Sequence, residues 1–314
     1  MMLYVFLLPY YICPVAQLLT SKLGLQTIIS YLCNVMTYEE LWRRLTPVYD
    51  VGEAKAIVRY VLDVRFGMSA TDVYCGKVTQ LAADECIRLE EIMRRLATAE
   101  PVQYVLGRAD FCGRSFRVAP GVLIPRPETE ELCDWVAADA SGGGERQSVL
   151  DIGTGSGCIA ITLSLNIPGC AVTAWDVSDA ALAIARRNAA ELGASVDMLV
   201  QDALRPPHDE RKWDVIVSNP PYICRRESAA MDRNVLEYEP STALFVPDDD
   251  PLLFYRAIAG YAREALRHDG ALYFEINPLY SVDMLAMLRE VGFDRVETRR
   301  DCFGKERMMK ATNS

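Results

Sequence analysis

The chain has 314 residues, which is the length of about two average domains and is enough to bury a sizeable core. Apolar residues make up 51% and charged residues 24%, values typical of globular proteins that exclude a fibrous or disordered chain. With 33 Lys and Arg against 43 Asp and Glu, the net charge of -10 disfavours a protein whose main partner is nucleic acid.

The first 35 residues differ from the rest of the chain because Lys22 is their only charged side chain. The uncharged stretch 1–21 is long enough for a membrane span, which needs about 20 residues. Pro9 and Pro14 interrupt it, and neither the basic start nor the cleavage site of a signal peptide is present. The ordinary polar and apolar pattern begins at Met36. Residues 1–35 are therefore either a membrane segment or an apolar extension that is not native, from a start assigned too early.

The ten cysteines are spread along the chain, and no two have the Cys-x-x-Cys spacing of many metal sites. His208 and His268 are the two histidines, so no metal site is expected. Dispersed cysteines in a chain of this length indicate reduced thiols. We therefore expect a cytoplasmic protein, with no membrane association outside residues 1–35.

Apolar side chains in residues 36–102 recur at spacings of three and four, which predicts a helical domain. Thr37 precedes Glu40 by three residues, and Thr79 lies just before another amphipathic run, so both are expected to begin helices. A small helical bundle of this kind is typical of a recognition or packing module.

Residues 103–122 change to the two-residue period of strands, and Phe111 and Phe116 flank the turn residue Gly113, which predicts a β-hairpin linker. Across 123–314, strand and helix patterns alternate. This predicts an α/β fold with a doubly wound, mostly parallel sheet and ligands at the carboxyl ends of its strands. The expected strands are Ser148–Ile152, Ala171–Asp176, Ser195–Val200, Trp213–Ser218, Ala271–Ile276, Asp294–Thr298 and Arg307–Ala311, with a helix at Ala180–Leu192.

A glycine-rich loop joins the first of these strands to a helix pattern that begins at Cys158. A dinucleotide fingerprint would need glycine at 158, and a phosphate-binding loop would need Gly-Lys-Ser or Gly-Lys-Thr, so neither pattern is complete. A simple tight turn remains an alternative, because glycines also permit sharp turns. The loop consists of Gly153, Thr154, Gly155, Ser156 and Gly157.

Two carboxylates sharpen the prediction for this loop. Asp176 ends the second strand 19 residues after Gly157, close to the offset of about 20 residues at which a carboxylate binds ribose hydroxyls. Asp151 at the loop entrance would repel a diphosphate, whereas S-adenosylmethionine carries an ammonium and a sulfonium. The charges therefore favour S-adenosylmethionine as cofactor. Asp202 after the third strand, with Ala203 beside it, is placed to meet the adenine, although Asp202 could equally cap a turn.

The fourth strand ends in the tetrapeptide Asn219-Pro220-Pro221-Tyr222. An amide or exocyclic amine is a poor nucleophile because its lone pair is delocalised. The side-chain oxygen of Asn219 and the backbone carbonyl of Pro220 can accept its two N–H bonds and aim the nitrogen at a methyl group. Pro221 restricts Pro220 to an extended conformation, and Tyr222 offers a flat face to a planar group. The tetrapeptide predicts methyl transfer to nitrogen.

With these motifs, residues 37–312 resemble the release-factor glutamine methyltransferase family (HemK/PrmC). The resemblance rests on the glycine loop, on Asn219–Tyr222, on Phe111-Cys112-Gly113-Arg114-Ser115-Phe116 and on Ile124-Pro125-Arg126-Pro127-Glu128-Thr129-Glu130. It implies a class I, Rossmann-like methyltransferase domain at 123–314. It also implies methyl transfer to the glutamine of the Gly-Gly-Gln tripeptide in peptide-chain release factors, with the helical domain helping to dock the release factor.

Carried over to this chain, the resemblance implies that Gly153–Gly157, Asp176 and Ala203 hold the cofactor and that Asn219–Tyr222 hold the glutamine. Phe111 is either a further cofactor neighbour or a packed aromatic of the hairpin. The chain departs from the family at Asn277, where Glu-Ile-Gly is common, and in residues 1–35.

Two other functions compete with this interpretation. A methyltransferase acting on an exocyclic amine of a nucleic-acid base would use the same tetrapeptide, but the net charge and the lack of Lys/Arg-rich stretches oppose it. A cofactor-binding adaptor would not need the side chain of Asn219.

Overall fold

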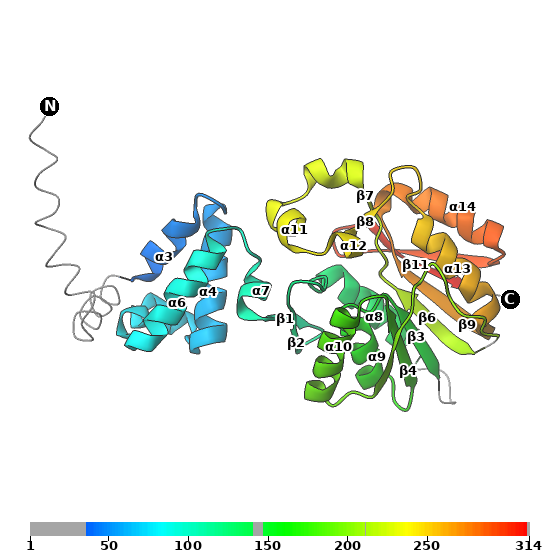
Figure 1. Cartoon of the computed structure of the whole chain (residues 1–314), viewed down its shortest axis with the longest axis horizontal. Coiled ribbons are helices and arrows are strands. Elements are labelled where there is room, and N and C mark those ends of the chain that lie inside the picture. Colours follow the sequence, from blue (N-terminus) through cyan, green and yellow to red (C-terminus); the bar gives the residue numbers. More distant parts are fainter. Residues whose placement is uncertain (1–35, 141–146, 211, 313–314) are drawn as a thin grey trace, which may run out of the picture. The chain divides into compact units, whose positions relative to one another are not determined.

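The computed structural model describes residues 36–140, 147–210 and 212–312, so the expectations for residues 1–35 lie outside the described residues. The chain divides into two compact units between Leu106 and Gly107. Figure 1 shows the helices of the first unit in blue and cyan and the sheet of the second in green to red. In the described part of the chain, no helix has the length and apolar character to span a bilayer.

The first unit is helical throughout its described residues, as the spacing of apolar side chains predicts. Leu41, Val58, Leu62 and Leu89 lie fully buried in one shared core, which explains why short helices are stable together. The elements are α3 (Tyr38–Leu45), α4 (Val51–Phe66), α5 (Ala70–Tyr74), η1 (Lys77–Gln80), α6 (Ala83–Leu96) and α7 (Val102–Leu106).

One of the two predicted helix starts is confirmed. The Thr37 side chain accepts the Glu40 N–H, and the Glu40 carboxylate accepts the Thr37 N–H, which forms a capping box at α3. The prediction for Thr79 is wrong, because it lies inside η1 and α6 begins only at Ala83. The apolar run alone did not mark the short helical turn before α6.

The second unit begins with a hairpin formed by β1 (Arg108–Phe111) and β2 (Arg114–Arg117) in antiparallel register. The hairpin is shorter than the predicted 103–122, because residues 103–106 belong to helix α7. The turn needs left-handed backbone, and Gly113 supplies it with φ +70°. Phe111 and Phe116 pack edge to face with ring centroids 5.9 Å apart, inside the core of this unit.

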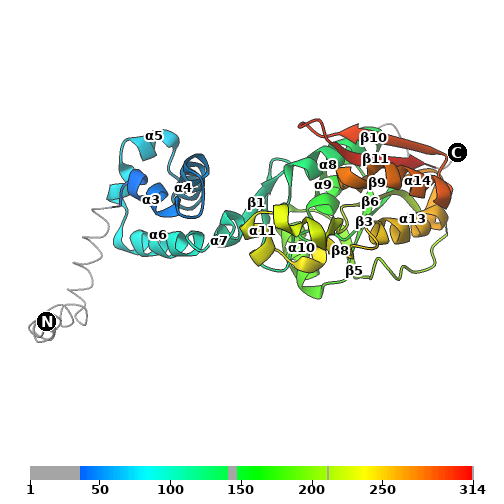
Figure 2. The ribbon, with the colours of Figure 1, turned by 90° about the horizontal axis from the view of Figure 1, so that it is seen from above.

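The seven strands of the main sheet correspond to the seven predicted ones, with ends shifted by a few residues. Their order is β10-β11-β9-β6-β3-β4-β5, parallel from β9 to β5, with β11 antiparallel to both neighbours. Figure 2 shows β10 and β11, in red, at one edge. The strands are β3 (Ser148–Ile152), β4 (Ala171–Asp176), β5 (Val196–Val200), β6 (Trp213–Ser218), β9 (Leu266–Glu275), β10 (Arg295–Arg300) and β11 (Glu306–Thr312).

Helices cover both faces of this sheet because strand side chains alternate between the faces. Val149 of β3 packs in one core with Leu132 and Leu182, whereas Leu150 packs in the other with Ile258 and Met284. The first core is built on α8 (Pro127–Ala140), α9 (Cys158–Asn166) and α10 (Asp179–Leu192), and the second on α13 (Leu253–Ala265) and α14 (Ser281–Val291). This is the class I, Rossmann-like arrangement.

The connection from β6 to α13 is long and carries its own small elements. The chain moves outward from β3 to β4 and β5 and then returns to β6 beside β3, so a crevice is expected at the carboxyl ends of β3 and β6. The connection consists of β7 (Ile223–Cys224), η2 (Arg225–Ala230), α11 (Arg233–Tyr238), α12 (Ser241–Leu244) and β8 (Phe245–Val246).

Most cysteines of the described part are free, in line with reduced thiols, but Cys86 is disulfide-bonded and departs from that expectation. The free cysteines are Cys75, Cys112, Cys133, Cys158, Cys170, Cys224 and Cys302.

Candidate functional site

The glycine loop after β3 takes left-handed backbone at Gly153, Gly155 and Gly157, with φ of +79°, +55° and +84°. Gly157 directly precedes α9 as its N-cap, and a Cβ there would lie 2.8 Å from Cδ1 of Ile161 and 3.1 Å from Cβ of Ala185. A side chain at 157 would thus disturb the packing of α9 on α10. The glycines therefore serve the turn, and Gly157 also serves the close packing of the two helices.

Asp176 at the end of β4 holds this loop in place. Its Oδ2 accepts the backbone N–H of Gly155 at 2.8 Å, and its Oδ1 accepts that of Ser178 at 2.9 Å. Each carboxylate oxygen has a further lone pair, so Asp176 can still accept a hydrogen bond from a ligand.

A cavity of about 600 Å³ lies over these carboxyl ends. Gly153, Gly155, Asp176, Asp202 and Ala203 line one part of it, and Asn219, Pro220 and Pro221 line another. Its size is within the range of small-molecule sites, about 300–1,000 Å³.

The charges in this cavity fit the donor expected from the sequence. Among its lining residues Asp176 and Asp202 are carboxylates and Arg225 is the cation, so it favours a ligand with positive charge over one with phosphates. Asp202 accepts the N–H of Leu204 through one oxygen, which leaves the other for a ligand. The residues present are therefore suited to S-adenosylmethionine.

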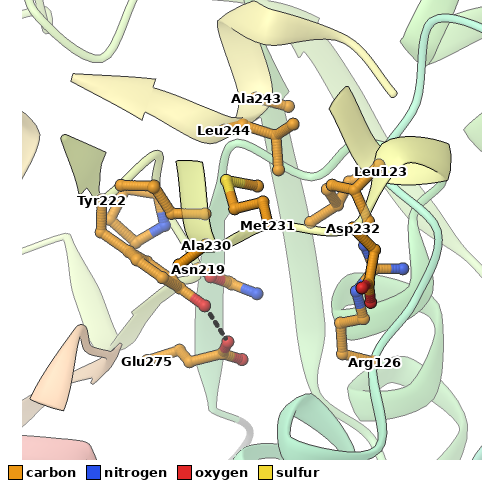
Figure 3. A pocket seen from close by; sticks show the side chains of 13 residues that line it. Leu123, Arg126, Asn219, Tyr222, Ala230, Met231, Asp232, Ala243, Leu244 and Glu275 are labelled. Carbon is orange, nitrogen blue, oxygen red and sulfur yellow. Dashed lines mark hydrogen bonds between the residues drawn. The ribbon is translucent and has the colours of Figure 1, made fainter. Parts of the chain in front are cut away.

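A second cavity of about 270 Å³ adjoins the tetrapeptide (Figure 3). Arg126, Tyr222, Met231, Asp232 and Glu275 are among its lining residues. Leu123, Asn219, Pro220 and Ala243 line both cavities. Asn219 and Pro220 therefore stand where a ligand in the first cavity and a ligand in the second would meet.

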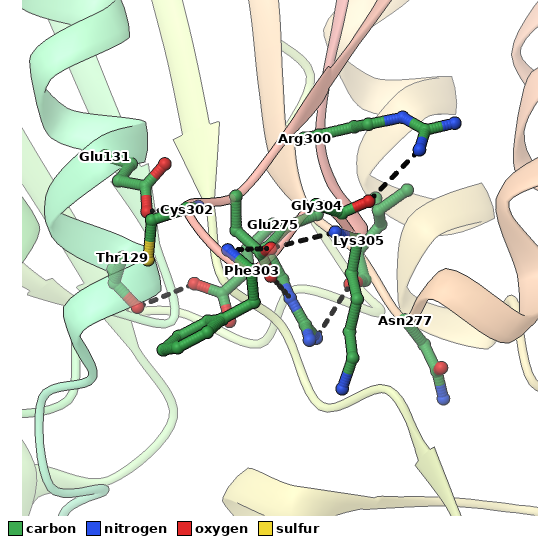
Figure 4. A network of polar contacts seen from close by, with 12 residues as sticks. Thr129, Glu131, Glu275, Asn277, Arg300, Cys302, Phe303, Gly304 and Lys305 are labelled. Carbon is green, nitrogen blue, oxygen red and sulfur yellow. Dashed lines mark hydrogen bonds and ion pairs between the residues drawn. The ribbon is translucent and has the colours of Figure 1, made fainter.

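Glu275, at the end of β9, connects several parts of the site although it is only 1% exposed. Its Oε1 accepts the Tyr222 hydroxyl at 3.0 Å, and its Oε2 accepts the Thr129 hydroxyl at 2.6 Å. Figures 3 and 4 show these two contacts. The Thr129 hydroxyl oxygen in turn accepts the side-chain NH2 of Asn219 at 3.2 Å.

Burial raises the pKa of Glu275, while the hydroxyls of Thr129 and Tyr222 and the charge of Arg307 oppose the shift. Arg307 is itself held in the structure by an ion pair with Asp301 at 3.3 Å. Burial, followed by the nearby carboxylate of Glu275, raises the pKa of Tyr222. The Tyr222 hydroxyl therefore stays protonated and donates.

Asn277, which stands where the resembling family commonly has glycine, has a structural role. The side-chain NH2 of Asn277 donates to the backbone carbonyl of Tyr222 at 3.2 Å and to the carboxylate of Glu227 at 3.1 Å. Its Oδ1 accepts the Leu279 N–H at 3.1 Å. Asn277 thus ties the tetrapeptide to the loop after β9.

Residues just before α8 are also fixed to the site. The carboxylate of Glu239 pairs with the Arg126 guanidinium and accepts the Ile124 N–H at 3.1 Å. The side chain of Glu239 is 1% exposed and that of Arg126 is 31% exposed, so loss of Arg126 would leave a buried carboxylate without its ion-pair partner.

Asp151, at the loop entrance, is fully buried and accepts hydrogen bonds from the Thr154 hydroxyl at 2.6 Å and the Ala160 N–H at 3.2 Å. Its other oxygen has no hydrogen-bond partner in the described part of the chain. Burial raises the pKa of Asp151 to about 7.

The predicted site residues fall into two groups. Gly153, Gly155, Asp176, Asp202, Ala203 and Asn219–Tyr222 line one cavity or both. Thr154, Ser156 and Gly157 do not line either cavity, and Phe111 is 1% exposed within the core. Among the described residues, no cluster of His, Cys, Asp and Glu is arranged to hold a metal ion.

Sequence analysis missed Thr129, Glu275, Arg126 and Glu239 as site residues. A signal existed for Thr129 and Arg126, because both lie in the Ile124–Glu130 motif on which the resemblance rests. The signal for Glu275 was its position as a single acidic residue at the end of an apolar strand. Nothing nearby in the sequence distinguished Glu239 from the other acidic residues.

Comparisons with known proteins show to which sequences this chain is similar. Residues 40–107 match the family model described as PrmC N-terminal domain, and residues 136–237 match that of the methyltransferase small domain. The release factor glutamine methyltransferase of Bacteroides thetaiotaomicron is 48% identical over 268 residues, which cover 85% of this chain and 95% of that protein. That of Flavobacterium psychrophilum is 37% identical and covers 85% and 94%.

A solved structure from Alicyclobacillus acidocaldarius, a release factor-specific protein-(glutamine-N5) methyltransferase, is 30% identical to this chain. It covers 63% of this chain and 99% of its own, with a TM-score of 0.38.

Proposed function

The chain belongs to the family of release factor glutamine methyltransferases, and we propose that it methylates the side-chain nitrogen of the glutamine in the Gly-Gly-Gln tripeptide of peptide-chain release factors. The methyl donor is S-adenosylmethionine. The observation that carries this proposal is that Asn219 and Pro220 line both the cavity suited to the donor and the smaller cavity beside it.

Asn219 and Pro220 make the nitrogen of the substrate reactive. The side-chain oxygen of Asn219 and the backbone carbonyl of Pro220 each accept one N–H of the glutamine amide. Both hydrogen bonds favour the positive charge that builds up on nitrogen during transfer. They also hold the amide so that its lone pair points toward the donor cavity.

The remaining groups hold and shield the amide. The ring of Tyr222 lines the smaller cavity and offers a flat face to the planar group. When bound, S-adenosylmethionine supplies an electrophilic methyl group on a sulfonium leaving group. Gly153, Gly155, Asp176, Asp202 and Ala203 bind it, and Asp176 accepts hydrogen bonds from its ribose.

The helical unit is proposed to dock the release factor, which acts in the cytoplasm. This unit has its own core, and the described residues that line both cavities all come from the second unit. That separation supports the proposal that the second unit contributes the chemistry and the first binds the release factor.

The test is incubation with labelled S-adenosylmethionine and a release factor, with DNA and RNA in parallel reactions. The label is expected in the glutamine of the tripeptide, located by mass spectrometry of peptides. A release factor with that glutamine replaced by asparagine is the matched control and is expected to stay unlabelled. Label in nucleic acid alone would overturn the proposal and favour a nucleic-acid amine as substrate.

A further inference from the structure

Two consecutive hydrogen bonds, one part-buried and one buried, connect Asn219 to Glu275 through Thr129. The Asn219 Nδ2 lies 3.2 Å from the Thr129 Oγ1, which lies 2.6 Å from the Glu275 Oε2. Thr129 is 2% exposed and Glu275 is 1% exposed, so water competes little for these groups. The three residues come from α8, the end of β6 and the end of β9.

The donor and the acceptor of each of these two hydrogen bonds can be assigned. The Tyr222 and Thr129 hydroxyls both donate to the Glu275 carboxyl group, and the Thr129 hydroxyl has one hydrogen, which it gives to Glu275. The hydroxyl oxygen can then only accept from Asn219, so it must face the NH2 of that amide. The orientation of the amide therefore follows from the chemistry of its partners.

This orientation matters because the two ends of an asparagine amide have opposite hydrogen-bonding character. With its NH2 on Thr129, Asn219 keeps its oxygen free to accept an N–H from a substrate. A flipped amide would bring its NH2 against the substrate NH2, where two donors meet and neither bond forms.

We propose that Thr129 and Glu275 are positioning residues that orient the Asn219 amide with its oxygen toward the substrate nitrogen. This inference rests on the proposed function and deepens it. Thr129 lines neither cavity, and Glu275 lines only the smaller one. Both reach the Asn219 amide through the Thr129 hydroxyl, whereas Asn219 itself touches the substrate.

Glu275 orients a second group of the site in the same way. Its Oε1 accepts the Tyr222 hydroxyl at 3.0 Å, so one carboxylate positions both ends of the tetrapeptide. The carboxylate is fixed in turn, because the Tyr255 hydroxyl donates to the Glu275 backbone carbonyl at 2.9 Å. The charged groups facing it are Arg307 and Glu128, of which Arg307 favours the ionised form.

The test compares Thr129→Val with Thr129→Ser. Valine has the shape of threonine without the hydroxyl, and kcat is expected to fall by ~10-fold or more, since misplaced reacting groups lose rate steeply. Serine keeps the hydroxyl and is expected to restore most of that rate. The donor Kd should change less than about threefold in both variants. Thr162→Val makes the same change at a fully buried site on α9 outside both cavities and serves as the control.

A double-variant cycle separates this role from a loss of packing. If Thr129 acts through Asn219, then Thr129→Val should lower kcat by less than about twofold when Asn219 is already alanine. An equal loss in both backgrounds would overturn the inference. So would a Thr129→Val enzyme as active as the Thr162→Val control.

An NMR measurement tests these two hydrogen bonds without any substrate. The side-chain NH2 signal of Asn219, assigned by its loss in Asn219→Ala, should shift in Thr129→Val and stay near its position in Thr129→Ser. An unchanged signal in Thr129→Val overturns the inference whatever the activity. A wild-type enzyme that leaves release factors unlabelled overturns the proposed function instead, so the two failures are distinguishable.

Discussion

The carboxylate of Asp176 accepts the backbone N–H of Gly155 at 2.8 Å, so the end of β4 holds the glycine loop that follows β3. The contact spans 21 positions in the chain. It gives Asp176 two tasks, since the same side chain shapes the loop and lines the larger cavity.

Asp176→Ala is therefore expected to weaken binding of S-adenosylmethionine by about 1–3 kcal/mol, through the lost hydrogen bonds to ribose and the loosened loop. Isothermal titration calorimetry measures this change. Asp179→Ala removes an exposed carboxylate from the first turn of α10 and should leave the affinity unchanged. Equal affinities in both variants would contradict the role of Asp176.

Asn219→Ala is expected to keep the donor Kd within a few fold while kcat for methyl transfer falls by ~100-fold or more. The reason is that the lost oxygen acts on the substrate nitrogen during transfer. Single-turnover assays with a release factor measure it. Asn166→Ala, an exposed asparagine at the end of α9, is the control. Unchanged turnover in Asn219→Ala would count against the mechanism.

Asn277→Gly is expected to lower the free energy of unfolding by about 1–2 kcal/mol, because the Tyr222 carbonyl and the Leu279 N–H lose their partner. Urea denaturation measures the loss. Asn277→Asp isolates the donor, since a carboxylate can still accept from Leu279 but cannot donate to Tyr222 and is repelled by Glu227. If Asn277→Asp were as stable as wild type, the donor bond would contribute nothing.

Arg126→Met is expected to destabilise the protein by about 2 kcal/mol, because the buried carboxylate of Glu239 would lose its partner. Adding Glu239→Gln should recover most of this loss. Arg43→Met breaks an exposed ion pair with Glu39 and should cost less than about 1 kcal/mol. Equal losses for Arg126→Met and Arg43→Met in urea denaturation would show that burial of Glu239 is not decisive.

The pH dependence of stability should report Asp151. Its pKa is about 7 in the folded protein and about 4 in an unfolded chain, so the unfolded state loses the proton first as pH rises. Below about pH 4 the protonated carboxyl group makes its full contribution to the stability of the folded protein. As pH rises, this contribution falls by up to roughly 1 kcal/mol per pH unit, and it is lost by about pH 7. Asp151→Asn keeps an acceptor for Thr154 but does not titrate.

The free energy of unfolding of Asp151→Asn relative to wild type should therefore increase between pH 4.5 and pH 7.5, two conditions chosen to span about that interval. Urea denaturation at several pH values measures the difference. A constant difference across this range would contradict the raised pKa.

The sequence by itself was sufficient for the seven strands of the main sheet and for the two segments that carry the chemistry, but not for the small elements between β6 and α13. Patterns of apolar residues along the chain are local, so they located the seven strands. The three-residue spacing between Thr37 and Glu40 is also local and located the capping box. The glycine loop and Asn219–Tyr222 could be recognised because each is a short run directly after a strand, where α/β sheets bind ligands.

Only the tertiary structure decided which distant side chains meet. Thr129 contacts Asn219 from 90 positions away and Glu275 from 146 positions away, and these contacts exist because α8 begins where β6 and β9 end. Sequence periodicity predicts which face of an element is buried, but not which polar group lies opposite it. That is set by how the elements pack, and packing joins residues without regard to their separation along the chain.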